Sequence, residues 1–261
     1  MAMYVISDPH GFYNETIAAL KEKGFDNDKN NRLILLGDVL DRGPDAVKLV
    51  YYLIGLLDAG RLILIRGNHE DLLEDALHTI EQGFIEEVAS EYSHHWKNKT
   101  FKTLLQLSGM TEAEAVYNPE KLVSRVKNSP YYTKLLPAAI DYYETDNHIF
   151  THGWIPCNRE YVEFEMRYNY DTDWRNASHE AWRRARWDNG MYLSYMFGVV
   201  EKDKTIVCGH YHASYGHSRI EKVCSEFDSD ADFSPYYGDG IIAIDGCVAF
   251  TKKVNCIVIE D

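Results

Sequence analysis

The sequence of 261 residues lacks a Cys-x-x-Cys pair, and its five cysteines are an odd number. Three of them lie in or beside apolar runs, where free cysteine behaves as a small hydrophobic residue, so we expect a reducing compartment. No apolar run approaches the roughly 20 residues that cross a bilayer. Because an apolar run begins as early as Tyr4, the sequence leaves no room for a secretory signal. We therefore expect a cytoplasmic protein without a membrane partner.

An excess of positive charge is also lacking. The chain has 27 Lys and Arg against 41 Asp and Glu, which gives a formal net charge of −14. Such a field repels polyanions, so we expect neither a nucleic acid duplex nor an anionic membrane as a partner. A phosphate-containing substrate would need local positive charge, and bound divalent cations would supply it.

What the sequence does have is five short apolar runs, rich in β-branched residues, that predict strands. The first three alternate with helical patterns at Glu15–Lys23, at Ala46–Leu57 and from about Glu70, as in βαβ units. This order predicts an α/β fold with a central sheet and helices on both sides. The five runs are Tyr4–Ser7, Leu33–Leu36, Leu62–Ile65, His148–Thr151 and Thr205–Cys208.

We expect one domain over residues 1–261 with two additions to the sheet core. Residues from about 83 to 136 show mostly helical patterns and predict a helical insertion. Residues from about 157 to 200 form an aromatic, cap-like segment. Its Tyr and Trp side chains would either stack on a nucleobase or simply pack the segment. Substrate identity is expected to depend on these two regions.

Each predicted strand is followed by side chains that can coordinate a metal ion. In sheets of this kind, ligands bind beyond the carboxyl ends of the strands, so these side chains should meet at one edge. Any one of these clusters alone would be ordinary, because a single histidine at a strand end is more often structural than a ligand. Their occurrence after five strands favours a metal site. The candidates are Asp8, His10, Asp38, Asn68, His152, His210 and His212.

Seven oxygen and imidazole ligands are too many for one ion and about right for two. They suit manganese, iron or zinc, and the absence of thiolates argues against a structural zinc site. Two ions roughly 3.5–4 Å apart need a bridging carboxylate, which we assign to Asp38. One ion would then take Asp8, His10 and His212. The other would take Asn68, His152 and His210.

The same motifs resemble, in order, the signature of the calcineurin-like metallophosphoesterases. They are Asp8-x-His10, Gly37-Asp38-x-x-Asp41-Arg42-Gly43, Gly67-Asn68-His69-Glu70, His152-Gly153 and Gly209-His210. The Asp-Arg-Gly and Gly-Asn-His-Glu forms resemble the branch that holds serine/threonine protein phosphatases and symmetrical diadenosine tetraphosphatases. The likeness covers residues 4–70 and about 148–260. In that branch a second histidine is usually missing at the place of His212, which is therefore either a ligand, as we expect, or an outer residue.

The resemblance implies a metallophosphoesterase fold, a central β-sandwich-like sheet core with flanking helices. It also implies two divalent metal ions, manganese first with iron or zinc as alternatives. The expected activity is hydrolysis of phosphate monoesters or nucleotide phosphoanhydrides by attack of a metal-bound hydroxide. The partner would be a phosphate-containing small molecule or a phosphoprotein. The alternatives are a serine/threonine protein phosphatase and a catalytically inactive interaction module, although every motif position is filled here.

Several polar residues next to the ligands receive roles in this scheme. Arg42 offers a planar fork of donors to phosphate oxygens, and Asn68 is expected to contact the substrate as well. By resemblance, His69 is the general acid, oriented and kept protonated by Asp41. Glu70 more plausibly favours a helix N-terminus than acts in catalysis.

The resemblance also implies a second arginine that binds phosphate, drawn from the region before the last histidine ligand. Arg183, Arg184 and Arg186 are the candidates. We prefer Arg186 because Arg186-Trp187-Asp188 is similar to a Trp-containing segment of the family.

Overall fold

The computed structural model describes residues 2–260 and contains two sheets packed face to face. The first sheet has the strand order β11-β1-β2-β3, and the second has the order β4-β5-β8-β10-β9. The first consists of β1 (Met3–Ile6), β2 (Arg32–Leu35), β3 (Leu62–Leu64) and β11 (Cys256–Ile259). The second consists of β4 (Tyr143–Glu144), β5 (His148–Phe150), β8 (Thr205–His212), β9 (Tyr236–Gly238) and β10 (Ile241–Asp245).

Parallel pairing in both sheets brings the strand ends to the same place. β1, β2 and β3 run parallel, and so do β5, β8 and β10, while β11, β4 and β9 pair antiparallel with their neighbours. Five predicted strands are therefore present, but they are divided between two sheets and do not share one central sheet. The sandwich-like core that the family resemblance implied is confirmed.

The division into two sheets follows from side-chain alternation along the strands. In β1, Met3 and Val5 face the other sheet, whereas Tyr4 and Ile6 face the helices. The interior of the sandwich also holds Phe150 from β5, Val207 from β8 and Ile244 from β10. A strand that is buried on both faces is apolar at every position. The sequence therefore does not show which face packs against the other sheet and which packs against helices.

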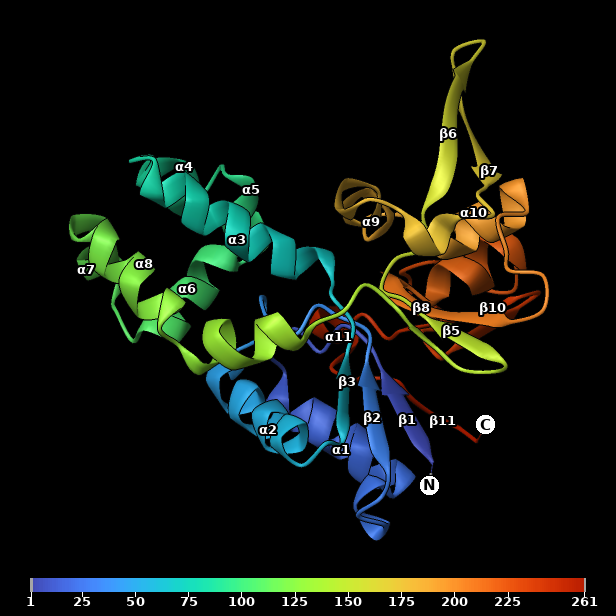
Figure 1. Cartoon of the computed structure of the whole chain (residues 1–261), viewed down its shortest axis with the longest axis horizontal. Coiled ribbons are helices and arrows are strands. Elements are labelled where there is room, and N and C mark those ends of the chain that lie inside the picture. Colours follow the sequence, from blue (N-terminus) through green and yellow to red (C-terminus); the bar gives the residue numbers. More distant parts are fainter. Residues whose placement is uncertain (1, 261) are drawn as a thin grey trace.

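The outer face of the first sheet is covered by helices, as the alternating pattern predicted. These are α1 (Tyr13–Lys23) and α2 (Ala46–Asp58), whereas α3 (Asn68–Glu81) leads away from the end of β3 towards the helices that follow it (Figure 1). Beyond α3, short helices form a helical lobe to one side of the sandwich (Figure 1). They are α4 (Ile85–Ala89), α5 (His94–Lys97), α6 (Thr100–Ser108), α7 (Glu112–Tyr117) and α8 (Pro119–Lys127), followed by turns at Tyr131–Leu135 and Leu136–Ala138.

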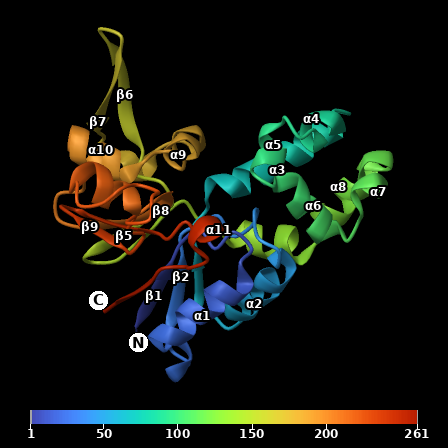
Figure 2. The same cartoon turned by 180° about the vertical axis from the view of Figure 1, so that it is seen from behind.

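The aromatic segment lies on the other side of the molecule. It begins with a hairpin of β6 (Cys157–Val162) and β7 (Glu165–Tyr170), which projects from the body (Figures 1 and 2). A short turn at Trp174–Asn176 leads to α9 (His179–Ala185) and α10 (Gly190–Phe197). Trp154, Trp174 and Trp182 pack with β5 and β8 in a separate buried cluster. Much of the aromatic content therefore fills this second core.

A last short helix, α11 (Val248–Thr251), lies between the two sheets' strand ends near the centre of the molecule (Figures 1 and 2). No helix in the described part of the chain is long and apolar enough to cross a membrane.

Candidate metal centre

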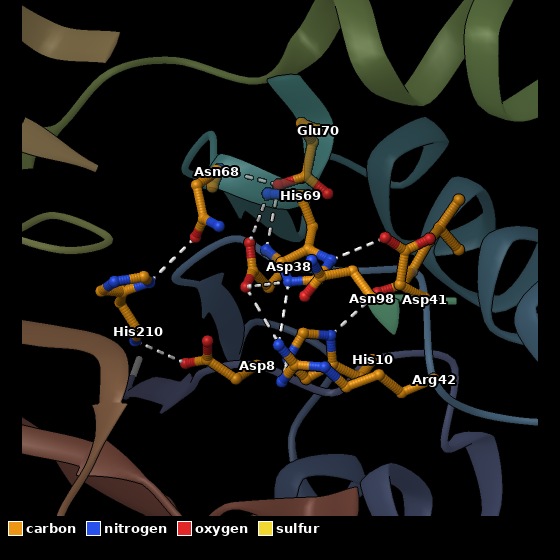
Figure 3. Close-up of polar contacts among 12 residues, drawn as sticks. Asp8, His10, Asp38, Asp41, Arg42, Asn68, His69, Glu70, Asn98 and His210 are labelled. Atoms are coloured by element: carbon orange, nitrogen blue, oxygen red, sulfur yellow. Dashed lines mark hydrogen bonds and ion pairs between the residues drawn. The ribbon is translucent and has the colours of Figure 1, made fainter. Parts of the chain in front are cut away.

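The loops that follow the strands bring six of the seven predicted ligands together (Figure 3). Asp8 and His10 follow β1, Asp38 follows β2, and Asn68 begins α3 directly after β3. From the second sheet, His152 follows β5 and His210 lies in β8, beside an irregularity in the pairing with β10. Asp8, His10, Asp38, Asn68 and His152 are each at most 3% exposed.

The backbone at these positions is strained. Asp8, His10, Asp38 and His210 have φ angles of +51°, +46°, +52° and +63°, although a non-glycine residue rarely adopts a positive φ. Asp41 and Arg42, at +75° and +63°, share this feature. Such conformations cost of the order of 1–3 kcal/mol each and gather where function requires them. The strain therefore marks the same cluster that the motifs indicate.

The glycines in the motifs allow the loops to approach one another. A Cβ at Gly67 would collide with Oδ1 of Asp38, and one at Gly209 would collide with Oδ2 of Asp8. Any side chain at these positions would therefore push a carboxylate out of the centre.

The titratable side chains form two groups that share Asp38. The first group is His10, Asp38 and His69, and the second group is Asp38, His152 and His210. In the first group, Oδ2 of Asp38 lies 3.7 Å from Nε2 of both His10 and His69. In the second group, Oδ1 of Asp38 lies 3.4 Å from Nε2 of His152. The two oxygens of one carboxylate thus face different groups.

The second group contains lone pairs that face each other. Nδ1–H of His152 donates to the carbonyl of Leu36 at 2.6 Å, which leaves a lone pair on Nε2. That Nε2 lies 2.8 Å from Oδ1 of Asn68, and Nδ1 of His210 lies 2.9 Å from the same oxygen. Burial lowers the pKa of His152 well below its usual value, so a proton does not separate these acceptors. A cation is the partner that suits them.

Asp8 adds a further unsatisfied acceptor. Its Oδ2 accepts the backbone N–H of His210 at 2.9 Å, whereas its buried Oδ1 has no hydrogen-bond partner among the described residues. Burial, followed by the charge of Asp245, raises the pKa of Asp8 well above its usual value. Burial and Asp8 do the same to the pKa of Asp38. Buried carboxylates and neutral imidazoles gathered in one place are a donor set that fits divalent ions.

The histidine tautomers also suit metal binding. Nδ1–H of His10 donates to the carbonyl of Leu40 at 2.9 Å, so Nε2 carries the lone pair that a metal ion would use. Burial lowers the pKa of His10 well below its usual value and that of His210 to about 4. Both imidazoles are therefore neutral near pH 7, which is the form that binds metals.

Arg42 lies at the first group. Its Nη1 donates to Nε2 of His10 at 2.7 Å, and its Nη2 donates to Nε2 of His69 at 3.0 Å. The guanidinium thus places a positive charge against the imidazole lone pairs. Arg42 as a whole is exposed, which leaves the fork accessible from outside.

His69 and Asp41 form the expected pair. Nδ1–H of His69 donates to Oδ2 of Asp41 at 2.6 Å, and Oγ1 of Thr100 donates to the same oxygen at 2.8 Å. Burial, followed by the charge of Arg42, lowers the pKa of His69 well below its usual value. Burial also raises the pKa of Asp41 to about 6. The prediction that Asp41 keeps His69 protonated therefore differs from the structure, because burial and Arg42 outweigh the carboxylate.

Glu70 connects the loops of the site, and its contacts do not point to catalysis. Oε2 accepts the backbone N–H groups of Asp38 at 2.9 Å and Gly67 at 2.7 Å, and Oε1 accepts that of Val39 at 3.1 Å. One buried carboxylate thus ties the loop after β2 to the start of α3.

Comparison with known proteins decides the family. A family model described as calcineurin-like phosphoesterase matches residues 1–232. The chain belongs to the calcineurin-like phosphoesterases. Among curated relatives, it is 44% identical over 70 residues to a symmetrical bis(5'-nucleosyl)-tetraphosphatase of Buchnera aphidicola subsp. Acyrthosiphon pisum, and 43% identical over 70 residues to that of Photorhabdus laumondii. The matched part spans 27% of this chain and 24% of the length of each relative.

Solved structures support the calcineurin-like phosphoesterase fold alone. A cold-active protein tyrosine phosphatase aligns with a TM-score of 0.52 at 15% identity, covering 99% of this chain and 73% of that one. The cold-active protein-tyrosine phosphatase of a psychrophilic Shewanella aligns with a TM-score of 0.50 at 15% identity, covering 100% and 75%.

Two residues expected at this phosphoesterase centre lie elsewhere. His212 is in neither group: its Nδ1 lies 2.9 Å from Oγ of Ser214, and its Nε2 lies 3.4 Å from a carboxylate oxygen of Glu226. The reason is the irregularity of β8, which separates the direction of His212 from that of His210. The structure therefore favours the open alternative that His212 is an outer residue.

Arg186 is the other displaced candidate. It is 2% exposed, and its guanidinium pairs with Asp71 at 2.7 Å and with Asp141. The two other candidates also form ion pairs: Arg183 pairs with Asp75, and Arg184 pairs with Glu180. Since the guanidinium of Arg186 is buried in ion pairs with Asp71 and Asp141, we do not assign phosphate binding to it.

Asp245 is a residue of the phosphoesterase centre that the sequence reasoning missed. It is 7% exposed at the end of β10, and burial raises its pKa to about 6. Its charge acts on Asp8, and its Oδ1 accepts the backbone N–H of Cys247 at 2.8 Å. A signal was present in the sequence, because the apolar run Ile241–Ile244 is followed directly by Asp245 and Gly246.

Proposed function

We propose that this protein is a metal-dependent hydrolase that cleaves phosphate esters or anhydrides at two divalent ions sharing Asp38. The carrying observation is the geometry of that carboxylate, whose two oxygens face the first and the second group. The unpaired Oδ1 of Asp8 and the opposed lone pairs around Asn68 support it. The ligands are Asp8, His10 and Asp38 for one ion, and Asp38, Asn68, His152 and His210 for the other.

Manganese is our first choice of metal, with iron or zinc as alternatives, because the ligands are oxygens and imidazoles. Two such ions supply positive charge to the phosphate and make a water molecule acidic near neutral pH. The tasks left to the protein are to bind the phosphate, to orient it and to hand a proton to the leaving group.

Arg42 binds the phosphate in this proposal. Its guanidinium offers two parallel N–H groups, which already reach the imidazoles of His10 and His69 and would turn to two phosphate oxygens. Asn68 uses Oδ1 towards His152 and His210, so its NH₂ group is left to donate to the substrate.

His69 acts as the general acid. Its Nδ1–H is fixed by Asp41, so Nε2 is the atom that carries the transferred proton. The positive charge of Arg42 disfavours a resting proton there. Phosphate bound to Arg42 would offset that charge and raise the pKa of His69. Protonation of the acid would thus follow substrate binding.

A nucleotide phosphoanhydride is our preferred substrate, since the curated relatives are named for hydrolysis of bis(5'-nucleosyl) tetraphosphates. A phosphoprotein is the second candidate, because the Gly-Asn-His-Glu form of the third motif resembles serine/threonine protein phosphatases as well as diadenosine tetraphosphatases. We also propose that residues 83–136 and 157–200 are additions within one domain that select the substrate.

The test is hydrolysis by manganese-loaded protein of diadenosine tetraphosphate, a phosphopeptide and p-nitrophenyl phosphate. Asp38→Asn should reduce turnover of each cleaved substrate by more than ~100-fold, since loss of an outer contact to a ligand already costs ~10–100-fold. Asp203→Asn, at an exposed residue, is the matched control and should keep full activity. Turnover surviving Asp38→Asn would disprove the shared carboxylate. Hydrolysis confined to the phosphopeptide would overturn the nucleotide preference.

A further inference from the structure

One exposed aromatic ring lies directly beside the second group. Trp187, in the loop after α9, is 44% exposed, and its ring centroid is 5.9 Å from that of His210. Its backbone carbonyl also accepts a hydrogen bond from the His210 imidazole. No other tryptophan in residues 2–260 is exposed, and three are at most 3% exposed within the second core. Among the described residues, the most exposed indole therefore lies at the metal centre.

A second exposed ring approaches Trp187 from the opposite side. His94, on α5 of the helical lobe, has its ring centroid 6.1 Å from that of Trp187, with the planes at 43°. The side-chain NH₂ of Asn98 donates to the carbonyl of His94 at 3.0 Å and lies 3.2 Å from its Nε2, which fixes the ring. His94 is exposed and forms no ion pair with an acidic side chain within residues 2–260, so its ring can contact a ligand.

The two rings belong to the two segments added to the sandwich. α5 lies in the helical lobe, and α9 lies on the opposite side, with the strand ends between and below them (Figures 1 and 2). His94 is also close to the first group: after burial, Arg42 and His210, its charge contributes to lowering the pKa of His69. Trp187 therefore lies near the second group, and His94 lies near the first group.

We propose that Trp187 and His94 form the subsite for the nucleobase of a nucleotide whose phosphates lie on the two groups. This inference rests on the proposed function and names the part of the substrate that the metal centre does not recognise. Indole and imidazole rings offer flat faces on which any base stacks, and stacking needs no fixed hydrogen-bond pattern. It also needs no positive charge, which suits a chain with a net charge of −14.

The kinetic test compares one substrate that has bases with one that has none. Diadenosine tetraphosphate and inorganic tripolyphosphate both contain phosphoanhydride bonds, but only the first carries adenine. Trp187→Ala should raise KM for diadenosine tetraphosphate about tenfold more than for tripolyphosphate, which corresponds to loss of one stacked base. Trp187→Phe should recover most of this loss, and His94→Ala should cause a smaller one. Tyr117→Ala, at an aromatic residue 85% exposed on α7, is the control and should change neither KM.

A binding test separates the subsite from hydrolysis. Adenosine monophosphate added to manganese-loaded protein should quench tryptophan fluorescence, and Trp187→Phe should remove that change. Quenching without nucleotide hydrolysis would refute the proposed function and keep the subsite. Nucleotide hydrolysis without quenching, and with equal losses on both substrates in Trp187→Ala, would refute the subsite and keep the function. Quenching by O-phosphotyrosine and not by adenosine monophosphate would also overturn the proposal, because the aromatic group would then be a tyrosine ring.

Discussion

The two groups that share Asp38 differ in the side chains that surround them. In the second group, His152 is 0% exposed and its ring is fixed between the Leu36 carbonyl and Asn68. The first group is lined by residues that can move or exchange protons, namely Arg42, His69 and Asp41. The difference teaches that both halves offer ligands for a cation, whereas only the first half also carries the side chains proposed to bind phosphate and to transfer a proton.

Substitution of His69 should have the largest effect on turnover and tests the comparison of the two groups most severely. His69 lies in the first group and is also the proposed general acid. His69→Ala should slow hydrolysis of diadenosine tetraphosphate by ~100-fold or more, the usual contribution of a general acid. The loss should be smaller for p-nitrophenyl phosphate, whose leaving group needs no proton. Metal content, measured by elemental analysis, should stay unchanged. Loss of one ion together with equal losses on both substrates would make His69 a ligand.

Thr100 links the first group to the helical lobe, so its substitution tests whether the lobe supports the proposed general acid. Its hydroxyl, buried at the start of α6, donates to Asp41. Thr100→Val keeps the shape and removes this donor, so Asp41 should hold His69 less firmly and kcat should fall about tenfold, within the usual range for an outer partner. Thr79→Val, which removes a hydroxyl bonded only to a helix carbonyl, is the control. An unchanged kcat for Thr100→Val would separate the lobe from catalysis.

Asp245→Asn should have the smallest effect on turnover of the three substitutions. It should, however, change the free energy of unfolding of the metal-free chain. Burial raises its pKa to about 6 from the usual 3.8, so its ionised form opposes folding of the metal-free chain. Asp245→Asn removes that penalty, which two pKa units set at about 3 kcal/mol. The gain should be full well above pH 6 and should be mostly lost as the pH falls to 4, where the folded wild-type carboxyl is protonated and that of the unfolded chain, with a pKa of 3.8, is becoming protonated.

Calorimetry of metal-free wild-type and variant protein between pH 4 and 8 measures this difference. If Asp245→Asn instead lowers the free energy of unfolding above pH 6, the ionised carboxylate stabilises the fold and does not oppose folding.

The motif segments could be located from the sequence because strand ends carry local signals. Apolar runs ending in Gly with Asp, Asn or His predict both the strand and the position of the side chain, and Asp38 and His152 follow that rule. The helices at Ala46–Asp58 and Asn68–Glu81 were predicted within two residues of their observed starts. The division into two sheets was not readable, since Ile34 and Leu35 look alike in sequence while facing different layers.

Contacts between distant segments were also beyond sequence reasoning. Thr100 reaches Asp41 across 59 positions, and nothing in its neighbourhood predicts that. Arg186 resembles a phosphate ligand in its motif, but pairing with Asp71, 115 positions away, gives it a buried place in the fold. Long-range pairing of charged side chains is decided by which surfaces pack together, and the order of residues alone does not contain that information.

The sharing of Asp38 by two ions is tested most directly by anomalous diffraction from crystals soaked in manganese chloride. The account predicts two peaks roughly 3.5–4 Å apart, with one carboxylate oxygen of Asp38 directed to each. A single peak, or two peaks of which only one contacts Asp38, would contradict it.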